Sequence, residues 1–230
     1  MTITALYAGN GGKPIFNEFI TPIGLAVHSY YDRPQLQTND KTNVPVMDEE
    51  GFQKADFKVT LAWPKEALNT LLIPLRTLAA TTRDQAWGPD CANDSWFRLE
   101  TFIRDGNNPE HNTKRKEYLY DMVYLNFKTK GIPVRAGNGA VSYSGRPGLI
   151  GPNKEDLLPS DMYAGCKVRV SGIMFGTEYS GRRFISMRLN NIQKAEDGER
   201  IGGSGKPDPR AQFDALEGIP GTRPLANIVL

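Results

Sequence analysis

The sequence predicts a mainly β protein built as one large domain, and three observations indicate this fold class. The 230 residues include 23 glycines and 16 prolines, which are too many for a helical bundle and are typical of short strands separated by turns. Several stretches alternate apolar and polar residues, as half-buried strands do. A single stretch has the apolar spacing of an amphipathic helix. A chain of this length is long enough to bury a sizeable core.

The first two predicted strands are residues 19–36, FITPIGLAVHSYYDRPQL, and residues 57–63, FKVTLAW. The second alternates cleanly, so we expect Phe57 in the core. The first strand alternates less cleanly. For Tyr30 and Tyr31, a core position and a base-stacking position fit the sequence equally well. A polar loop separates the two strands.

The one predicted helix spans residues 65–83, KEALNTLLIPLRTLAATTR, and is expected to pack against the sheet. Its apolar residues recur at spacings of three and four, and packing explains such a stripe better than a partner-binding face does. Pro74 lies inside the pattern and is expected to kink or divide the helix. The stripe consists of Leu68, Leu71, Leu72, Leu75 and Leu78.

A long excursion from the sheet follows the helix at residues 84–120. It carries the aromatic residues Trp87, Trp96 and Phe97 and the basic run KRK at 114–116. The basic run fits a loop that folds over DNA and a merely solvated loop equally well.

Residues 121–130, DMVYLNFKTK, alternate again and predict a strand. Phe127 is on the apolar side and is expected in the core. Tyr124 and Lys128 are on the other side, so we expect an exposed tyrosine beside a cation. The turn-rich connection after this strand carries Arg135.

The last predicted strands form a hairpin, residues 166–189, CKVRVSGIMFGTEYSGRRFISMRL, with one cationic face. Lys167, Arg169 and Arg188 lie on one parity of the pleat, and apolar residues occupy the other. The sequence admits two explanations of this face, a solvated surface and a surface that follows phosphates. The turn region adds Arg182, Arg183 and Phe184.

Charge and cysteine content limit the classes of function. The net charge is only +2, from 28 basic and 26 acidic residues, so any nucleic-acid footprint must be local. Cys91 and Cys166 are far apart and have neither zinc-site nor disulfide-framework spacing. No signal peptide or membrane span is recognisable. We therefore expect a soluble protein in a reducing cytoplasm, without a membrane partner.

The sequence offers little material for catalysis, and we expect no catalytic residues, no metal and no cofactor. It has two histidines, no nucleophile elbow and no phosphate-binding P-loop. Four acidic residues would suit a divalent ion in a nuclease, but a solvated loop contains the same residues. They are Asp90, Asp94, Glu100 and Asp105.

Aromatic residues beside cations on strand faces favour binding of single-stranded DNA. Each base offers a flat face for stacking, and the backbone offers one charge per nucleotide. A small curved β-barrel with a groove flanked by loops is the usual platform. The candidate DNA-binding residues are Tyr30, Tyr124, Lys128, Arg135, Lys167, Arg169, Arg182, Arg183, Phe184 and Arg188.

Three stretches resemble the C-terminal half of a family of bacteriophage single-stranded DNA-binding proteins with an OB-fold. They are GRPGLI (145–150), MYAGCKVRVSGIMFG (162–176) and ISMRLNNIQKAEDGERIGG (185–203). The order of the earlier elements is also similar, so the resemblance covers about residues 15–203. It implies a five-stranded OB barrel with one helix and long loop insertions. It also implies a protein that coats single-stranded DNA during phage replication or recombination, in the host cytoplasm and beside other phage replication or recombination proteins.

The expected domain organisation is one DNA-binding domain at residues 1–203 and a flexible tail at residues 204–230. The tail is rich in Gly, Pro and charge, and it ends in NIVL rather than in the acidic end that such proteins use to recruit partners. Two alternatives remain from other classes, a metal-dependent phage nuclease or resolvase and a virion structural protein. The sequence leaves the oligomeric state open.

Overall fold

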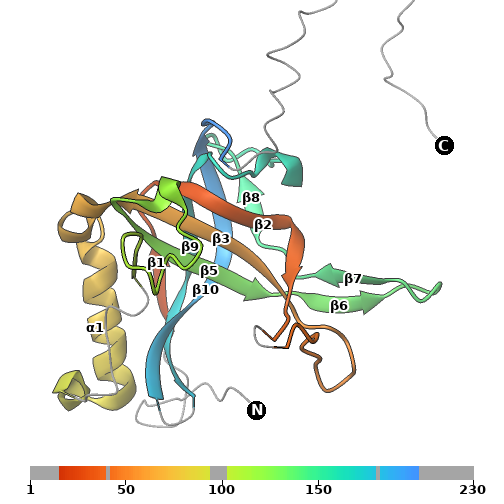
Figure 1. Cartoon of the computed structure of the whole chain (residues 1–230), viewed down its shortest axis with the longest axis horizontal. Coiled ribbons are helices and arrows are strands. Elements are labelled where there is room, and N and C mark those ends of the chain that lie inside the picture. Colours follow the sequence, from red (N-terminus) through yellow and green to blue (C-terminus); the bar gives the residue numbers. More distant parts are fainter. Residues whose placement is uncertain (1–15, 40–41, 94–102, 180–181, 202–230) are drawn as a thin grey trace, which may run out of the picture.

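The described part of the chain forms a closed β-barrel with one α-helix at its end and a two-stranded arm that extends from it (Figure 1). The computed structural model describes residues 16–39, 42–93, 103–179 and 182–201. The strands are β1 (Asn17–Ile20), β2 (Gly24–Leu36), β3 (Ala55–Pro64), β4 (Arg104–Asp105), β5 (Met122–Lys130), β6 (Ile132–Arg135), β7 (Val141–Ser144), β8 (Gly148–Ile150), β9 (Lys167–Tyr179) and β10 (Arg182–Glu196). The helices are α1 (Ile73–Trp87) and the short 3-10 turns η1 (Lys65–Asn69), η2 (Pro89–Asn93), η4 (Glu117–Leu119) and η5 (Pro159–Asp161).

Five strands close the barrel in the order β9, β2, β3, β5, β10 and back to β9. Neighbouring strands are antiparallel, except that β5 and β10 run parallel where Lys128 pairs with Arg188. Three short strands extend the sheet at its margins, since β1 pairs with β9, β8 with β10 and β4 with β5. A small closed barrel of five strands is the architecture of the OB-fold. The prediction of a mainly β OB barrel with one helix and long insertions is confirmed.

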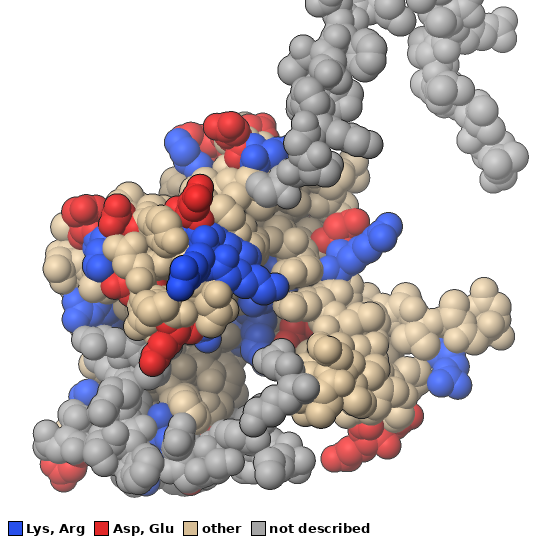
Figure 2. All heavy atoms as spheres, in the orientation of Figure 1, with Lys and Arg blue, Asp and Glu red and all other residues tan. Residues whose placement is uncertain are grey.

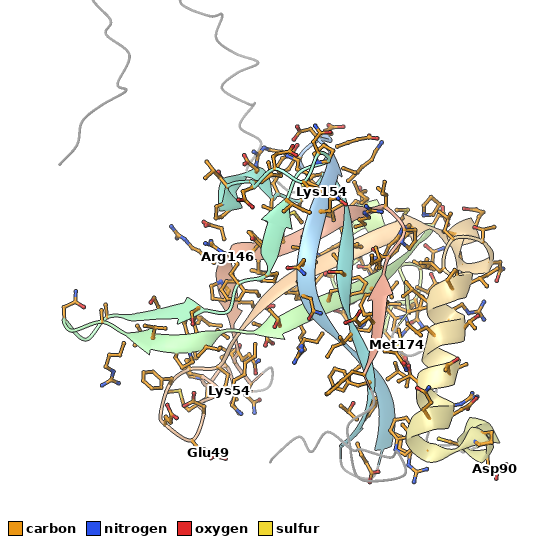
Figure 3. All side chains as sticks on the ribbon, turned by 180° about the vertical axis from the view of Figure 1, so that it is seen from behind. Glu49, Lys54, Asp90, Arg146, Lys154 and Met174 are labelled. Atoms are coloured by element: carbon orange, nitrogen blue, oxygen red, sulfur yellow. The ribbon has the colours of Figure 1, made fainter. Side chains whose placement is uncertain are left out.

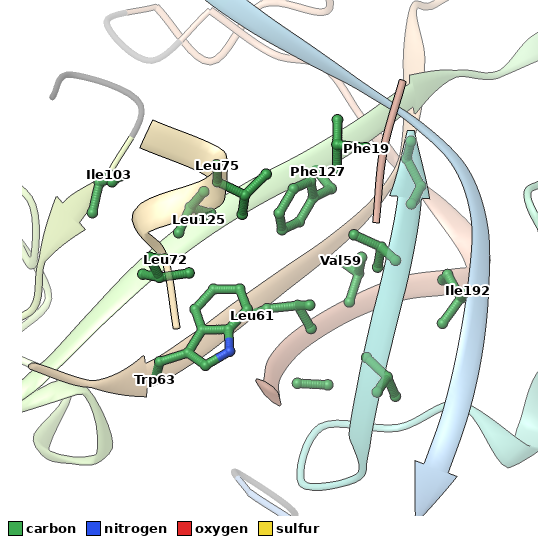
Figure 4. Packing of buried hydrophobic residues seen from close by; sticks show 14 of the residues in the cluster. Phe19, Val59, Leu61, Trp63, Leu72, Leu75, Ile103, Leu125, Phe127 and Ile192 are labelled. Carbon is green, nitrogen blue, oxygen red and sulfur yellow. The ribbon is translucent and has the colours of Figure 1, made fainter. Parts of the chain in front are cut away.

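Apolar and polar residues alternate along β3 and β5, and this alternation places the apolar side chains in the core, as the sequence predicts. Phe57 and Phe127 are almost fully buried. Val59 and Leu61 belong to the same core cluster as Phe127 (Figure 4). Residues at the intervening positions of both strands face outward. Burial of these apolar side chains is the main favourable contribution to the stability of the barrel.

The helix differs in part from its prediction, because the predicted stretch is divided into η1 and α1. Pro74 lies in the first turn of α1, where its missing N–H costs no hydrogen bond, so the division before it is confirmed. The division also changes the buried face: Leu72 and Leu75 reach the core, whereas Leu71 is exposed. The helix packs closely on β9 because Gly176 has no side chain. A Cβ there would lie 2.8 Å from the Trp87 ring.

The two neighbouring tyrosines of β2 are separated by the sheet. Tyr31 points inward and is buried, and its hydroxyl donates a hydrogen bond of 2.6 Å to the carbonyl oxygen of Pro147. Tyr30 pairs with Lys58 of β3 and lies on the outer face, where 41% of it is exposed. The structure therefore assigns Tyr31 to the core and leaves Tyr30 available for stacking.

The end of the described chain returns to the barrel. Ile201 donates its backbone N–H to the carbonyl oxygen of Ala164. Gly165 permits this return, because its φ is +118° and a Cβ would lie 1.9 Å from the carbonyl oxygen of Glu199. The expected flexible tail, residues 204–230, lies outside the described residues. In the part of the chain that is described, no helix is both long and apolar enough to cross a membrane.

Candidate nucleic-acid interface

A basic groove of about 220 Å³ lies on the outer face of β2, β3 and β5. The loop of residues 106–121, here the covering loop, forms its other wall. Its lining includes four cations, two histidines and two tyrosines, and no acidic residue is among the described side chains that line it. These eight residues are Lys58, Arg104, Lys114, Lys116, His28, His111, Tyr30 and Tyr124.

The register of the strands extends the basic groove into a row across the barrel. Tyr30 pairs with Lys58, Lys58 with Lys128, and Lys128 with Arg188. Residues paired across strands point to the same face, so these four side chains are neighbours on the outside. Figure 2 shows Lys and Arg gathered near the middle of this face, where β2, β3 and β5 cross in Figure 1.

Asn112 and Tyr124 hold the covering loop over the strands. The buried amide of Asn112 donates to the carbonyl oxygens of Gly106 and Lys116 and accepts from the Lys116 N–H. The hydroxyl of Tyr124 donates to the carbonyl oxygen of His111 at 2.7 Å. Gly106 is required at the loop's start, since a Cβ there would lie 1.8 Å from the carbonyl oxygen of Leu119. Lys114 and Lys116 are therefore carried on an ordered segment.

Burial, together with the neighbouring cations, lowers the pKa values of two groups in the groove. Burial, followed by the charges of Lys116, Lys58 and Lys114, lowers the pKa of His28 to about 4. Its neutral ring lies within hydrogen-bonding distance of the Lys116 ammonium and the Tyr118 hydroxyl. Burial, and then Arg104 and Lys128, also lower the pKa of Lys58. An anion that binds in the groove offsets the charge of these cations, so its binding is electrostatically favourable.

The structure corrects one expected feature, because Tyr124 is not an exposed residue. Only 6% of it is accessible, and it packs with Val27, Ala62 and Leu119. The strand parity is as predicted, and Tyr124 does face outward from the barrel. The covering loop then lies over it, which strand periodicity does not reveal. Its ring supports the groove's wall and is not a free stacking surface.

The cationic face of the β9–β10 hairpin exists as predicted but is divided between two places. Arg188 joins the row that continues from the basic groove. Lys167 and Arg169 lie at the other end of the hairpin, outside the lining of the groove. The Lys167 ammonium is 2.7 Å from the Glu196 carboxylate, and the Arg169 side chain donates to Gln193 at 2.8 Å.

The remaining candidate residues lie at the edges of the barrel. Arg135 is on the arm, with its guanidinium 5.0 Å from the centre of the Phe52 ring. Arg183 lies near the tip of the hairpin, 3.8 Å from the Glu178 carboxylate. Phe184 is half-buried beside it on β10. The side chain of Arg182 lies outside the described residues, as do Trp96 and Phe97.

The candidate carboxylates of a metal site are not gathered. Asp105 is 2.8 Å from the Lys65 ammonium, and this hydrogen bond lowers its pKa. Asp90 is exposed on η2. Asp94 and Glu100 lie outside the described residues. Among the residues described, no three His, Cys, Asp or Glu side chains are placed to hold a metal ion together.

Several residues of the groove are not among the DNA-binding residues expected from the sequence. Lys58 occupies the outward parity of a strand whose inward parity is Phe57, Val59 and Leu61, so this alternation was an available signal. Arg104 belongs to a strand of two residues, which has no periodicity to detect. His28 lies opposite Thr60 of β3, and only this pairing places it in the groove.

The fold and the groove together define a class of protein. OB barrels bind oligonucleotides on the face of their second and third strands, which are β3 and β5 in this barrel. Residues 44–219 match the family described as Enterobacter phage Enc34, ssDNA-binding protein. The match covers most of the chain, and the chain belongs to this family. None of the curated proteins matches the chain in sequence.

Two solved structures of the bacteriophage Enc34 single-stranded DNA-binding protein are similar to this chain. The C-terminal truncation of that protein has a TM-score of 0.52 and 16% sequence identity, covering 80% of this chain and 88% of that chain. Its complex with ssDNA has a TM-score of 0.51 and 17% identity, covering 86% of this chain and 98% of that chain. At this identity the similarity supports the fold.

Proposed function

We propose that this chain binds single-stranded DNA without catalysing a reaction on it, and that the strand lies in the basic groove. One observation carries the proposal. Four cations and an exposed tyrosine line a groove with no acidic residue in its described lining, on the barrel face that OB-folds use for oligonucleotides. Membership of the family of ssDNA-binding proteins supports it.

The chemistry of the groove suits a strand bound by backbone and base faces. Lys58, Arg104 and Lys116 neutralise phosphates, and the row through Lys128 and Arg188 continues the path across the barrel. The half-exposed ring of Tyr30 offers a surface for one base. Stacking and phosphate contacts carry little base identity, so binding is tolerant of sequence. The role is to coat and protect the strand during phage replication or recombination in the host cytoplasm.

A titration of labelled oligonucleotides at two salt concentrations tests this proposal. Four phosphate contacts give a slope of about −2.8 for log K against log salt, or roughly a fiftyfold loss of affinity between about 50 and 200 mM. We expect dT and mixed-sequence strands to differ by less than about a hundredfold. Absence of binding, or affinity that salt does not change, would contradict it.

The two alternatives give different results in the same assays. A nuclease would cut the labelled strand when Mg²⁺ is added, whereas a coating protein leaves it intact. A virion structural protein would form large oligomers and show no affinity for DNA. The proposed domain boundary near residue 203 is tested by deleting residues 204–230, which should leave thermal unfolding and short-strand affinity unchanged.

Binding should also take up a proton at His28. In the free protein burial and the nearby lysines keep the pKa of His28 at about 4, and a phosphate in the groove raises it by offsetting their charge. The bound state then holds more protons than the free state. Affinity therefore rises as pH falls from about 7 to about 5, by at most about tenfold per pH unit for one proton.

Two histidine variants show which group is responsible. His28→Gln should reduce the pH dependence of the affinity in this range. His111→Gln is the comparison, because His111 lines the same groove. A His28→Gln variant with the full pH dependence of the parent would overturn the assignment.

A further inference from the structure

The arm, formed by β6 and β7 with their turn at residues 136–140, has two unlike faces. Within the described part of the chain, its two strands pair with each other and with no further strand. One face is held against the loop before β3, because the Tyr143 hydroxyl donates to the carbonyl oxygen of Gln53 at 2.6 Å and Arg135 lies over Phe52. Among the described residues, no side-chain hydrogen bond or ring contact joins the other face to the rest of the barrel. This face, here the free face of the arm, carries Ile132, Val134, Ser142 and Ser144, which are all exposed.

The free face of the arm is uncharged, and two of its four side chains are apolar. Ile132 is 57% exposed and Val134 is 45% exposed. The arm's one described charged residue, Arg135, lies on the opposite face, so the free face is unsuited to phosphates. An isolated two-stranded hairpin is only marginally stable in water, and an exposed apolar ribbon with open edges is a template for association. These features indicate a protein partner.

A second, mainly apolar groove lies elsewhere on the barrel, where β1, β9, β10 and β8 run side by side. Its volume is about 390 Å³. Ile20 forms one wall and is 65% exposed, and Ile150 forms the opposite wall. Between them the floor includes Ile192 of β10 and Ser171 of β9. The groove is separate from the basic groove, and no residue lines both.

Charges beside the arm and beside the apolar groove are complementary. Asp48, Glu49 and Glu50 lie on the loop under the arm, and they line a hollow together with Ile132 at the base of the arm. Lys54 and Lys130 line the same hollow, so acidic residues outnumber basic ones there by three to two. Arg169 lines the apolar groove, and Lys154 follows β8 at its end. Figure 3 shows Glu49 below the arm and Lys154 at the far end of the barrel.

From this complementarity we infer that the arm of one copy docks in the apolar groove of the next copy along the DNA. Ile132 and Val134 are then buried by packing against Ile20 and Ile150. The acidic residues of the loop under the arm lie close to Arg169. The two surfaces are different, so the contact is head to tail and extends without closing. DNA holds neighbours at high effective concentration, so a small contact is sufficient. This inference rests on the proposed function and adds cooperative assembly to it.

Two charge variants and one control test the contact. Ile132→Glu with Val134→Glu disables the arm, and Ile20→Glu disables the groove. Leu71→Glu places a negative charge at an exposed apolar site that lies outside the arm and does not line the apolar groove. All are assayed on a short strand that holds one copy and on a long strand that holds several. Affinity for the short strand reports on the basic groove alone, so failure of the proposed function is seen separately.

We expect the parent and Leu71→Glu to bind the long strand at least about tenfold more tightly per copy than the short one. Both docking variants should lose this excess and keep the short-strand affinity. A mixture of the two variants on a strand for two copies should recover it, because one intact arm meets one intact groove. If both variants bind the long strand as tightly as the parent, or if the mixture recovers nothing, head-to-tail docking is wrong.

Discussion

Replacing Lys58, Arg104 and Lys116 together with glutamine is expected to lower affinity for a short single strand by about 100-fold at about 0.1 M salt. Each lost phosphate contact reduces the slope of log K against log salt by about 0.7, or about 2.1 for all three. Parent and variant should therefore converge near 1 M salt. Fluorescence anisotropy over a range of salt concentrations measures both the affinity and the slope.

A matched variant distinguishes the effect of losing the groove's cations from the effect of lowering the net charge. Arg76→Gln, Lys154→Gln and Lys167→Gln together make the same change in charge, and none of these residues lines the basic groove. This control should keep nearly the parent slope. Equal losses in the two triple variants would show that general charge, rather than the basic groove, attracts the strand. Thermal unfolding of both variants shows whether the barrel is intact.

The parity of the strands was predictable because it depends only on local alternation. Phe57 and Phe127 are in the core as expected, and Lys128 and Arg188 are outside. A side chain in a two-faced strand has only two directions available, and burial of the apolar set decides between them. The outward cations of the barrel therefore follow from the sequence.

The register between strands decides which outward-facing residues become neighbours. This register cannot be read from local sequence patterns. Lys58, Lys128 and Arg188 are far apart in the chain, and pairing across three strands brings them into one row. Tyr30 and Tyr31 show the same limit. The first strand's alternation is irregular because its pairing with β3 shifts between Ala26 and His28, a β-bulge that no turn residue announces.

Tyr124 shows how a distant segment changes the environment of a correctly placed side chain. Its outward direction was predictable, but its burial arises from the covering loop. That loop is positioned by the buried amide of Asn112 and by the absence of a side chain at Gly106. An irregular segment of this kind has no period, so its course over the strand was beyond local analysis. The same loop places Lys114 and Lys116 of the basic run at 114–116 in the lining of the groove.

Of the two candidate tyrosines, Tyr30 is the one whose ring is exposed in the proposed site. Tyr30→Ala is therefore expected to weaken short-strand binding by about 1 to 3 kcal/mol, or about 5-fold to 150-fold. The salt slope should stay as in the parent, because no ion pair is lost. Tyr30→Phe should bind nearly as tightly as the parent, since the ring face provides the contact. Anisotropy titrations of one dT oligonucleotide at several salt concentrations measure all these quantities.

Tyr120→Ala is the matched control, because Tyr120 is 48% exposed and does not line the basic groove. It should bind as the parent does, which excludes a general effect of removing a surface tyrosine. Tyr30 is half-exposed, so its removal leaves no large cavity and the barrel should unfold at nearly the parent temperature. If folded Tyr30→Ala binds like the parent, no base stacks on this ring. The groove would then hold the strand by its phosphates alone, and the salt slope would account for all of its affinity.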